Sequence, residues 1–569
     1  MALDATLAPD TAPVVALRPP QQVMRLERMG SAFATRLSFM PSLLRQLARE
    51  NWTFSRPVFA IDSAGCGHAV LAVHKDGRSY SLVAFCQDLD PSDRTDRVIA
   101  EQWDATFALF DGVPGDDDLT RLAANVPKQE AGRFLPSELV LSRANKSVRF
   151  FEHVVNALAS GIQPDPTLVR QVGYLMRTTA VYGNGKFGIA DRAKIAERPE
   201  FRGPFRVEML TVYLIRCFTL ELVEHLARCR NPAGAVALDG AIKRHLGIGN
   251  ATGLGMAPFL IHHPVLLHNW IRARETALAR VRSLPVIAPV PRERFNALLA
   301  CAKAHLNEWQ VADLRQTGRI DALHGDLEWL RHWWHDDTAW MQGALPWDAL
   351  YRRAAATLSL EGQELLVALM LEPYGPLIDD LAEQMSADGD GDLDPTMAVG
   401  TLRSLIAAHY AWAFDIDFTR RETQQLFWYV SEEKAEPRVG HRFAEPGADK
   451  EMPLAVARDV QPLALALKAT DAGESTAAFL ARMPAFRHLV RRVQTVARHP
   501  YGEIHDNLLD AACLPIDLLR CKLAFFGAGK FDPKSDRWTR ITMYQGAPTA
   551  EELTPQRADT WCLPALAVS

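Results

Sequence analysis

The sequence predicts an α+β protein that is predominantly α-helical, with a large helical body and a small antiparallel β-sheet near the N-terminus. Short alternating apolar runs lie between residues 52 and about 112, whereas after Ser137 apolar residues recur at helical spacing almost to the end. Residues 537–544 (RWTRITMY) return to a strand pattern. Because a lone strand has no local partner there, we expect it to join the N-terminal sheet.

The small sheet is predicted from alternation and one turn. Short apolar runs occur at residues 58–62, 69–74 and 79–85. The last two are joined by residues 75–78 (KDGR), and Asp-Gly between alternating runs is the strongest short-range signal of a hairpin. A fourth strand is expected at residues 106–110, which precede another Asp-Gly pair.

Helices flank this sheet on both sides in the sequence. Residues 21–51 place leucines on one stripe and Arg36, Arg45 and Arg49 on the opposite side. Such a basic amphipathic helix either packs against a domain or lies on a membrane surface, and we interpret it as a packing helix. A second helix is expected to begin at Ser137 and to end at Gly161.

The remaining chain is predicted to form the helical body. Residues 206–229 are apolar on most faces, as expected of a central core helix, and the charges along this stretch argue against a membrane span. Residues 287–294 (IAPVPRER) contain two prolines and are the best linker candidate. Further helices are expected at 234–246, 256–282, 292–315, 359–371, 396–413, 474–498 and 505–524.

We therefore expect four parts along the chain. They are a disordered N-terminal tail (1–20), a small α+β domain with the antiparallel sheet (21–135), a helical domain with two glycine-rich loops (136–286), and a second helical domain ending in the returning strand (287–569).

Composition narrows the class of protein. A content of 48% hydrophobic and 23% charged residues is typical of a globular chain, and the net charge of −5 argues against nucleic acid as an obligatory partner. The N-terminus lacks the basic start and unbroken apolar run of a secretory signal. The eight cysteines lack the spacing of zinc or redox motifs. We expect a cytoplasmic protein with reduced thiols and no membrane association.

Two loops share one pattern, aromatic-Gly-x-Gly-Lys-Phe, each after an apolar helix and each followed by Asp-Arg. They either converge on an anion, with backbone N–H groups and a lysine from each, or they are two similar helix ends. Neither has the spacing of a Walker motif, which disfavours ATP hydrolysis. The residues concerned are Tyr182, Gly183, Gly185 and Lys186 in the first loop, and Gly527, Gly529 and Lys530 in the second.

A second glycine-rich segment, 245–256 (HLGIGNATGLGM), is expected to be a loop between two helices. It lacks a preceding predicted strand, so the resemblance of its spacing to a dinucleotide fingerprint carries little weight. Either it is a tight helix connection, or it presents N–H groups to an anion at the start of the next helix. In the second case the substrate-binding residues are Asn250, Thr252, Gly253 and Gly255.

Two further residues are candidates for the site. His263 follows the glycine-rich segment and is the best-placed general acid or base, because histidine titrates near neutrality; the alternative is a hydrogen-bonded core histidine. Arg438 lies in a charged segment (SEEKAEPR) that is either a solvated face or, if buried, a carboxylate clamp. His332, His335 and Asp336 lack a supporting motif, so no metal site is predicted.

These features predict a cytoplasmic enzyme that acts on a small anionic substrate, a carboxylate or a phosphate, by acid–base chemistry. The expected reaction is elimination, isomerisation or hydrolysis, by a lyase, isomerase or hydrolase, and not by a nucleotide-dependent oxidoreductase or kinase. The catalytic residues would be His263, Tyr182, Lys186 and Lys530. No cofactor is identified by a motif.

The alternative is a non-catalytic helical scaffold, regulator or ligand sensor, in which the two lysine loops are helix caps. A distance of about ten ångströms between Lys186 and Lys530 would favour the anion site, because like charges so close need an anion to offset their repulsion. Homo-oligomerisation stays open in either case.

Overall fold

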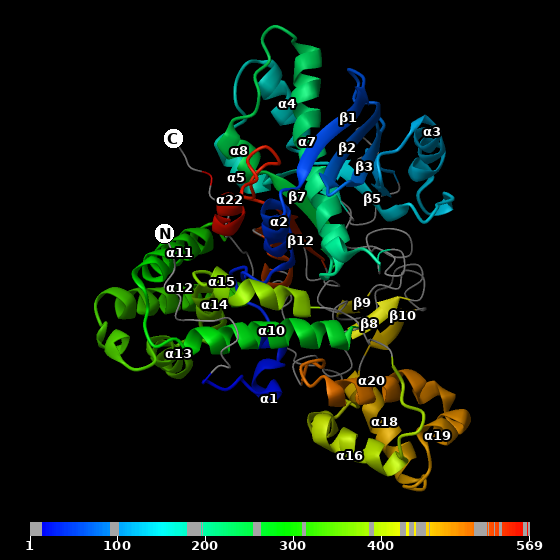
Figure 1. Ribbon diagram of the computed structural model, residues 1–569, viewed down its shortest axis with the longest axis vertical. Helices are drawn as coiled ribbons and strands as arrows, with labels where there is room; N and C mark the ends of the chain where they lie inside the picture. The colour runs from blue at the N-terminus through cyan, green and yellow to red at the C-terminus, as the bar shows by residue number, and fades with distance from the viewer. Residues whose placement is uncertain are drawn as a thin grey trace. The chain divides into compact units, whose positions relative to one another are not determined.

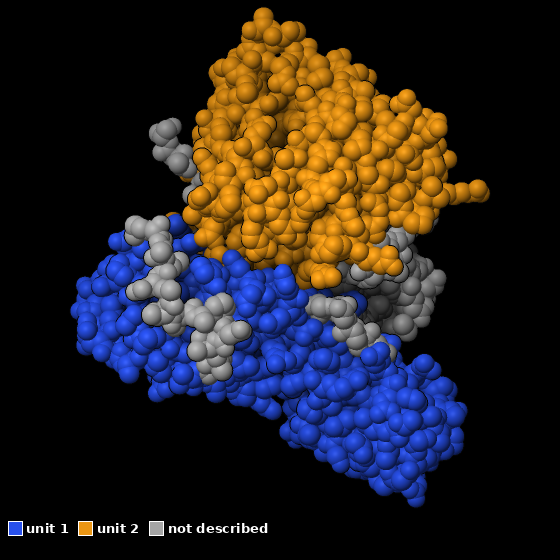
Figure 2. Space-filling model, in the orientation of Figure 1, with its two compact units in different colours: residues 1–32, 254–303, 311–521 blue, residues 33–253, 304–310, 522–569 orange. Residues whose placement is uncertain are grey.

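The computed structural model describes most of the chain as two compact units, each assembled from separate segments (Figure 2). Unit 1 comprises residues 1–32, 254–303 and 311–521, and unit 2 comprises residues 33–253, 304–310 and 522–569. The described residues are 14–90, 102–178, 195, 197–253, 263–309, 314–385, 392–420, 428–431, 437–439, 451–454, 456–505, 521, 523–528, 530–533, 538–561 and 566.

Unit 2 is built on a nine-stranded sheet of order β1-β2-β3-β4-β5-β6-β7-β12-β11. Strands β6 and β7 are parallel and the other neighbours are antiparallel. The strands are β1 (Thr53–Ile61), β2 (Gly67–Lys75), β3 (Arg78–Cys86), β4 (Ala105–Asp111), β5 (Glu138–Lys146), β6 (Tyr174–Thr178), β7 (Gly247–Gly253), β11 (Lys530–Pro533) and β12 (Trp538–Met543).

The predicted fold class, a mainly helical protein with a small antiparallel sheet, is therefore wrong. The sheet is large and mixed, and its strands come from both halves of the chain. Strand β5 shows why the prediction failed, because it was expected to be the start of a helix. Most of its residues are buried, and a short apolar run buried on both faces fits a helix and a strand equally well. A helix begins only at Phe151.

The hairpin prediction is confirmed. Lys75 and Arg78 are paired at the ends of β2 and β3, and both residues between them have positive φ, 49° at Asp76 and 79° at Gly77. Two consecutive left-handed residues fit the right-handed twist of the flanking strands, which is why Asp-Gly is favoured there.

Helices cover both faces of the sheet in unit 2. The helical elements are α2 (Phe39–Arg49), α3 (Asp116–Asn125), η2 (Val126–Ala131), α4 (Phe151–Ala159), α5 (Pro166–Val172), η3 (Pro199–Phe201), α7 (Arg206–Arg230), α8 (Gly240–His245) and α22 (Pro555–Thr560). Helix α7 is the predicted core helix, and Figure 1 shows it beside the sheet. Its Phe218 ring contacts the rings of Phe59 and Phe107.

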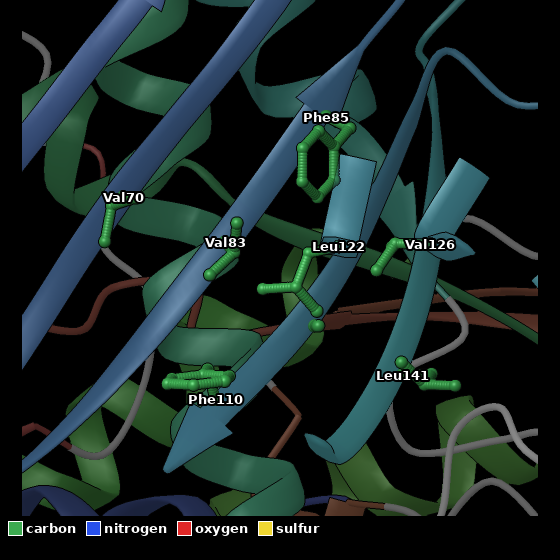
Figure 3. Packing of buried hydrophobic residues seen from close by; sticks show 8 residues of the cluster. Val70, Val83, Phe85, Phe110, Leu122, Val126 and Leu141 are labelled. Carbon is green, nitrogen blue, oxygen red and sulfur yellow. The ribbon is translucent and has the colours of Figure 1, made fainter. Parts of the chain in front are cut away.

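The opposite face carries the hydrophobic cluster of Figure 3. Ala108 and Phe110 alternate with Phe107 along β4 and so point to the other side of the sheet. There they meet Leu122 of α3 and Val126, which begins η2. The cluster also contains Val70, Val83, Phe85 and Leu141.

Unit 1 is mainly helical. A small three-stranded sheet of order β10-β8-β9 consists of β8 (Trp428–Ser431), β9 (Pro437–Val439) and β10 (Glu451–Leu454). The helical elements are α1 (Pro20–Val23), η1 (Leu26–Arg28), α10 (Pro264–Arg282), α11 (Pro289–Asn307), α12 (Leu314–His335), η4 (Ala339–Gln342), α13 (Pro346–Thr357), α14 (Leu360–Leu371), α15 (Gly375–Ile378), η5 (Asp379–Gln384), α16 (Val399–His409), η6 (Ala411–Asp415), α18 (Val456–Lys468), α19 (Thr476–Arg482), η8 (Pro484–Phe486) and α20 (Arg487–Arg498). The last residues of α11, 304–307, are assigned to unit 2.

Residues 14–20, placed in the expected disordered tail, are held in unit 1 by buried ion pairs. Arg18, which is 3% exposed, donates through Nε to Glu275 Oε2 at 2.7 Å and through Nη1 to Glu364 Oε1 at 2.7 Å. Burial alone would raise the pKa of Glu364, but the guanidinium groups of Arg18 and Arg274 outweigh it and hold that pKa below its usual range. The segment is therefore part of the core of unit 1.

Among the described residues, no helix is long and apolar enough to cross a membrane.

Replacing Leu122 by Ala tests the packing of α3 on the sheet. The side chain is fully buried in the cluster, so its truncation should destabilise unit 2 by about 2–5 kcal/mol. The exposed neighbour Thr120, replaced by Ala, should change stability by no more than about 0.5 kcal/mol. Urea denaturation followed by circular dichroism measures both, and equal effects would contradict the packing.

Replacing Arg18 by Met tests the buried ion pairs of unit 1. It leaves two buried carboxylates short of a partner, so we expect a loss of about 3–5 kcal/mol. The control is Lys303→Met, which removes an exposed ion pair with Glu328 and should cost about 0–1 kcal/mol. Tryptophan fluorescence in urea reports the transition. A midpoint for Arg18→Met that matches the control would show that this segment does not anchor unit 1.

Candidate functional site

The predicted site residues do not fall in one place. Some lie in unit 1, some in unit 2, and the others outside the described residues. Six of the predicted residues lie outside the described residues: Tyr182, Gly183, Gly185, Lys186, Gly255 and Gly529. The two interpretations of the lysine loops, a shared anion site or two helix ends, therefore both stay predictions for Lys186. Unit 1 contains His263 and Arg438, and unit 2 contains Asn250, Thr252, Gly253, Gly527 and Lys530.

The expected loop at Asn250, Thr252 and Gly253 is instead strand β7, in the interior of the sheet. The absence of a side chain at its glycines lets neighbouring residues pack closely against the strand. A Cβ at Gly249 would lie only 3.0 Å from the ring of Tyr174. Asn250 is fully buried, and its Nδ2 lies 3.7 Å from Met543 Sδ. The glycine content that suggested a ligand loop is therefore explained by close strand packing.

The second lysine loop begins as a helix cap. Gly527 ends the helical residues 523–526 with φ +79°, and its N–H donates to Leu523 O at 2.8 Å, which is the single-bond left-handed cap. Lys530 then opens strand β11 and pairs with Thr542 of β12. Gly527 therefore ends a helix, as one of the two interpretations of this loop predicted.

His263 and Arg438 lie in different elements of unit 1. His263 is half-buried immediately before α10, and its carbonyl accepts from Leu267 N at 2.9 Å. Arg438 is the middle residue of strand β9 and pairs with Tyr429 of β8, so the expected charged face beside a helix is part of a small sheet.

A different group of residues, at the start of α7 in unit 2, has the features of an anion site. Phe205 is the N-cap residue with φ +56° and makes no side-chain cap bond, and Arg206 is the first helical residue. Arg206 is only 7% exposed, and its Nη1 has no hydrogen-bond partner among the described residues. Its side chain folds back over Gly203, where a Cβ would lie 2.3 Å from Arg206 Nε.

Helix α2 presents a polar stripe to this helix start. Phe39, Ser42, Arg45 and Arg49 follow each other at intervals of three or four residues and so share one side of α2. The ring of Phe39 lies 5.0 Å from that of Phe205, which brings the stripe to the beginning of α7. Ser42 Oγ is buried without a hydrogen-bond partner among the described residues. We call Arg206, Arg45, Arg49 and Ser42 the arginine site.

Neighbouring arginines disfavour the charged form of Arg206. Burial and repulsion from Arg45 lower the pKa of Arg206 to about 10; Arg49 also lowers this pKa, and Tyr544 and Glu50 offset part of the effect. The Glu50 carboxylate is itself engaged, at 2.5 Å from Lys75 Nζ and 3.0 Å from Trp52 Nε1. Buried charges require hydrogen bonds or a counter-charge, and Nη1 of Arg206 has no such partner among the described residues.

Arg216 provides the comparison, because it is a second buried arginine on the same helix. Its guanidinium donates to five backbone carbonyls: Leu246 O, Pro548 O, Lys243 O, Arg244 O and Ala547 O. Unit 2 thus satisfies one buried guanidinium completely and leaves Arg206 Nη1 without an acceptor among the described residues.

Only part of the signal for this site can be read from the amino-acid sequence. The basic side of residues 36–49 was evident, and so was the charge of Arg206 within an apolar helix. What could not be seen is that these two segments meet.

Among the described residues, no group of three or more histidine, cysteine or carboxylate side chains is arranged to hold a metal ion. Comparisons of the chain with protein-family models, with curated proteins and with solved structures found no match.

Replacing Gly527 by Ala tests the helix cap against α2. Both Gly527 and Gly77 have φ +79°, so Ala at either position carries the same backbone strain of about 1 kcal/mol. A Cβ at Gly527 would also lie 2.8 Å from Pro41 Cδ, whereas nothing lies within 4 Å of a Cβ at Gly77. Gly527→Ala should therefore lower the melting temperature clearly more than Gly77→Ala; equal losses would show that the contact with α2 is not tight.

Proposed function

We propose that the chain binds a small carboxylate or phosphate anion at the arginine site and is a cytoplasmic enzyme whose substrate carries that anion. The observation that carries the proposal is Arg206, a buried guanidinium with an unpartnered Nη1 at the start of a 25-residue helix. An anion there would accept from the guanidinium and from N–H groups at the start of α7.

The physical argument is one of charge compensation. A buried cation without a counter-charge is destabilising, and the positive end of the helix dipole adds to its cost. Arg45 and Arg49 increase the repulsion. A bound anion reverses the sign of all these interactions, so the site favours occupancy by a small negatively charged group.

We also propose that the chain converts its bound substrate by acid–base catalysis. Elimination, isomerisation or hydrolysis next to a carboxylate or phosphate needs a general acid or base, and within unit 2 the proposed group is Tyr182, which lies outside the described residues. A ligand sensor would use the same anion site, because binding is common to an enzyme and a sensor. Conversion of a bound substrate, measured with the purified full chain, separates the two.

Replacing Arg206 and Arg216 by Met, one at a time, tests the anion site. Without small anions, Arg206→Met should leave the melting temperature unchanged or raise it by about 2–4 °C, because it removes a buried charge whose Nη1 has no partner among the described residues. Arg216→Met should lower it, since five carbonyl contacts lose their donor. Differential scanning fluorimetry measures both variants.

Addition of phosphate or acetate completes this test. At least one of the two anions should stabilise the wild-type chain, and Arg206→Met should lose most of that shift. The proposal fails if Arg206→Met is destabilised as strongly as Arg216→Met, or if it keeps the full anion-induced shift.

A further inference from the structure

We infer that Lys146, a buried lysine at the end of strand β5 in unit 2, is a nucleophilic amine that forms an imine with a small aldehyde or ketone. This site is separate from the arginine site and does not depend on the proposed function. Leu226, which lies beside the amine of Lys146, follows Arg206 by 20 residues along α7, so the two sites are about 30 Å apart.

The ion pair of Lys146 differs from those of two other lysines in unit 2. Lys75 and Lys243 hold carboxylate oxygens at 2.5 and 2.7 Å, and their side chains are 25% and 24% exposed. The side chain of Lys146 is only 7% exposed, yet its Nζ lies 3.9 Å from Asp104 Oδ1, beyond hydrogen-bond distance. A buried ammonium is costly unless it is both paired and hydrogen-bonded, and this ion pair provides only the first. Buried lysines of this kind commonly serve as Schiff-base amines.

Asp104 is placed to take a proton from this amine. Its side chain is fully buried, and its Oδ2 accepts from the backbone N–H of Lys146 at 2.9 Å while Oδ1 faces Nζ of the same residue. The backbone N–H of Asp104 donates in turn to Asn145 Oδ1 at 2.8 Å. Backbone hydrogen bonds therefore fix the carboxylate beside the amine, as the general base of a covalent mechanism requires.

The amine has apolar neighbours and space for a small group. Nζ lies 5.2 Å from the centre of the ring of Phe151, the first residue of α4. A Cβ at Gly65 would lie 3.8 Å from Nζ and 3.6 Å from Leu226 Cδ2, which are ordinary contacts, so the missing side chain leaves room beside the amine. The turn that contains Gly65 is exposed at residues 62–64 and half-buried at 66–68, which gives a small molecule a short path from solvent.

Imine formation at this site uses only the amine, the carboxylate and the carbonyl compound. Asp104 accepts a proton from the ammonium, and the neutral amine adds to the carbonyl carbon. The carbonyl oxygen then takes the proton back from Asp104 and becomes a hydroxyl group. This hydroxyl leaves as water with one proton from the nitrogen, and the product is a protonated imine next to the Asp104 carboxylate. The step needs neither an oxidant nor a reductant.

Reductive trapping of the full wild-type chain tests the inference. Propionaldehyde is added in limiting amount with cyanoborohydride at neutral pH, and peptide mass spectrometry measures the rate of modification at each lysine. Lys146 should react at least about tenfold faster than Lys128 and Lys468, which are exposed. Exposure alone predicts the opposite order, so modification of Lys146 at an equal or lower rate overturns the inference.

Variants of the full chain assign the rapid reaction to one amine. Lys146→Arg keeps a positive charge beside Asp104 but cannot form an imine, so the rapidly formed adduct should disappear from the mass spectrum of the intact chain. Lys75→Arg is the matched control, because it changes a paired lysine at the end of β2, and it should keep that adduct. Circular dichroism checks that both variants are folded.

Each result of this experiment decides the inference. A rapidly formed adduct that persists in folded Lys146→Arg overturns it, because another group must then be the nucleophile. If Lys146→Arg does not fold, the rates at the individual lysines of the wild-type chain still give the answer. Loss of anion binding at the arginine site would leave these rates unchanged, so failure of the proposed function and failure of this inference are seen in different measurements.

Discussion

Unit 2 depends on the burial of a single helix, α7. Eighteen of its 25 residues are buried, so it can exist only while it is enclosed on nearly every side. The sheet encloses it through contacts such as Phe218 with Phe107, and Arg216 fastens it to the backbone at residues 243–246 and 547–548. Segments from distant parts of the chain are thereby held around one axis.

The burial of α7 also buries the guanidinium of Arg206. At the start of α7 the left-handed Phe205 turns the chain sharply, and the following arginine is drawn into the protein with the helix. Arg216, further along, is surrounded by carbonyl groups that accept its hydrogen bonds. Arg206 instead meets the basic stripe of α2. The packing that stabilises unit 2 therefore also keeps a cation where burial disfavours its charged form.

Local patterns in the sequence were sufficient for some elements and not for others. Asp76 and Gly77 were enough to predict the β2–β3 hairpin, because the turn depends only on its own residues. Strand β5 was missed because burial on both faces removes the alternation by which a strand is recognised. Strand β7 was missed because its glycines make room for residues of other strands, such as Tyr174. The sequence does not show that these residues are neighbours. The arginine site depends likewise on a meeting of α2 with α7.

The pairing of β7 with β12 has a consequence for the order in which the chain can fold during synthesis. Asn250 lies opposite Ile541, and β6 is the other neighbour of β7. Throughout translation of the intervening residues, which include most of unit 1, one side of β7 has its backbone N–H and C=O groups unpaired. A nascent chain in this state offers a ready template for another strand, so holding that edge apart from other chains is a requirement of its biosynthesis.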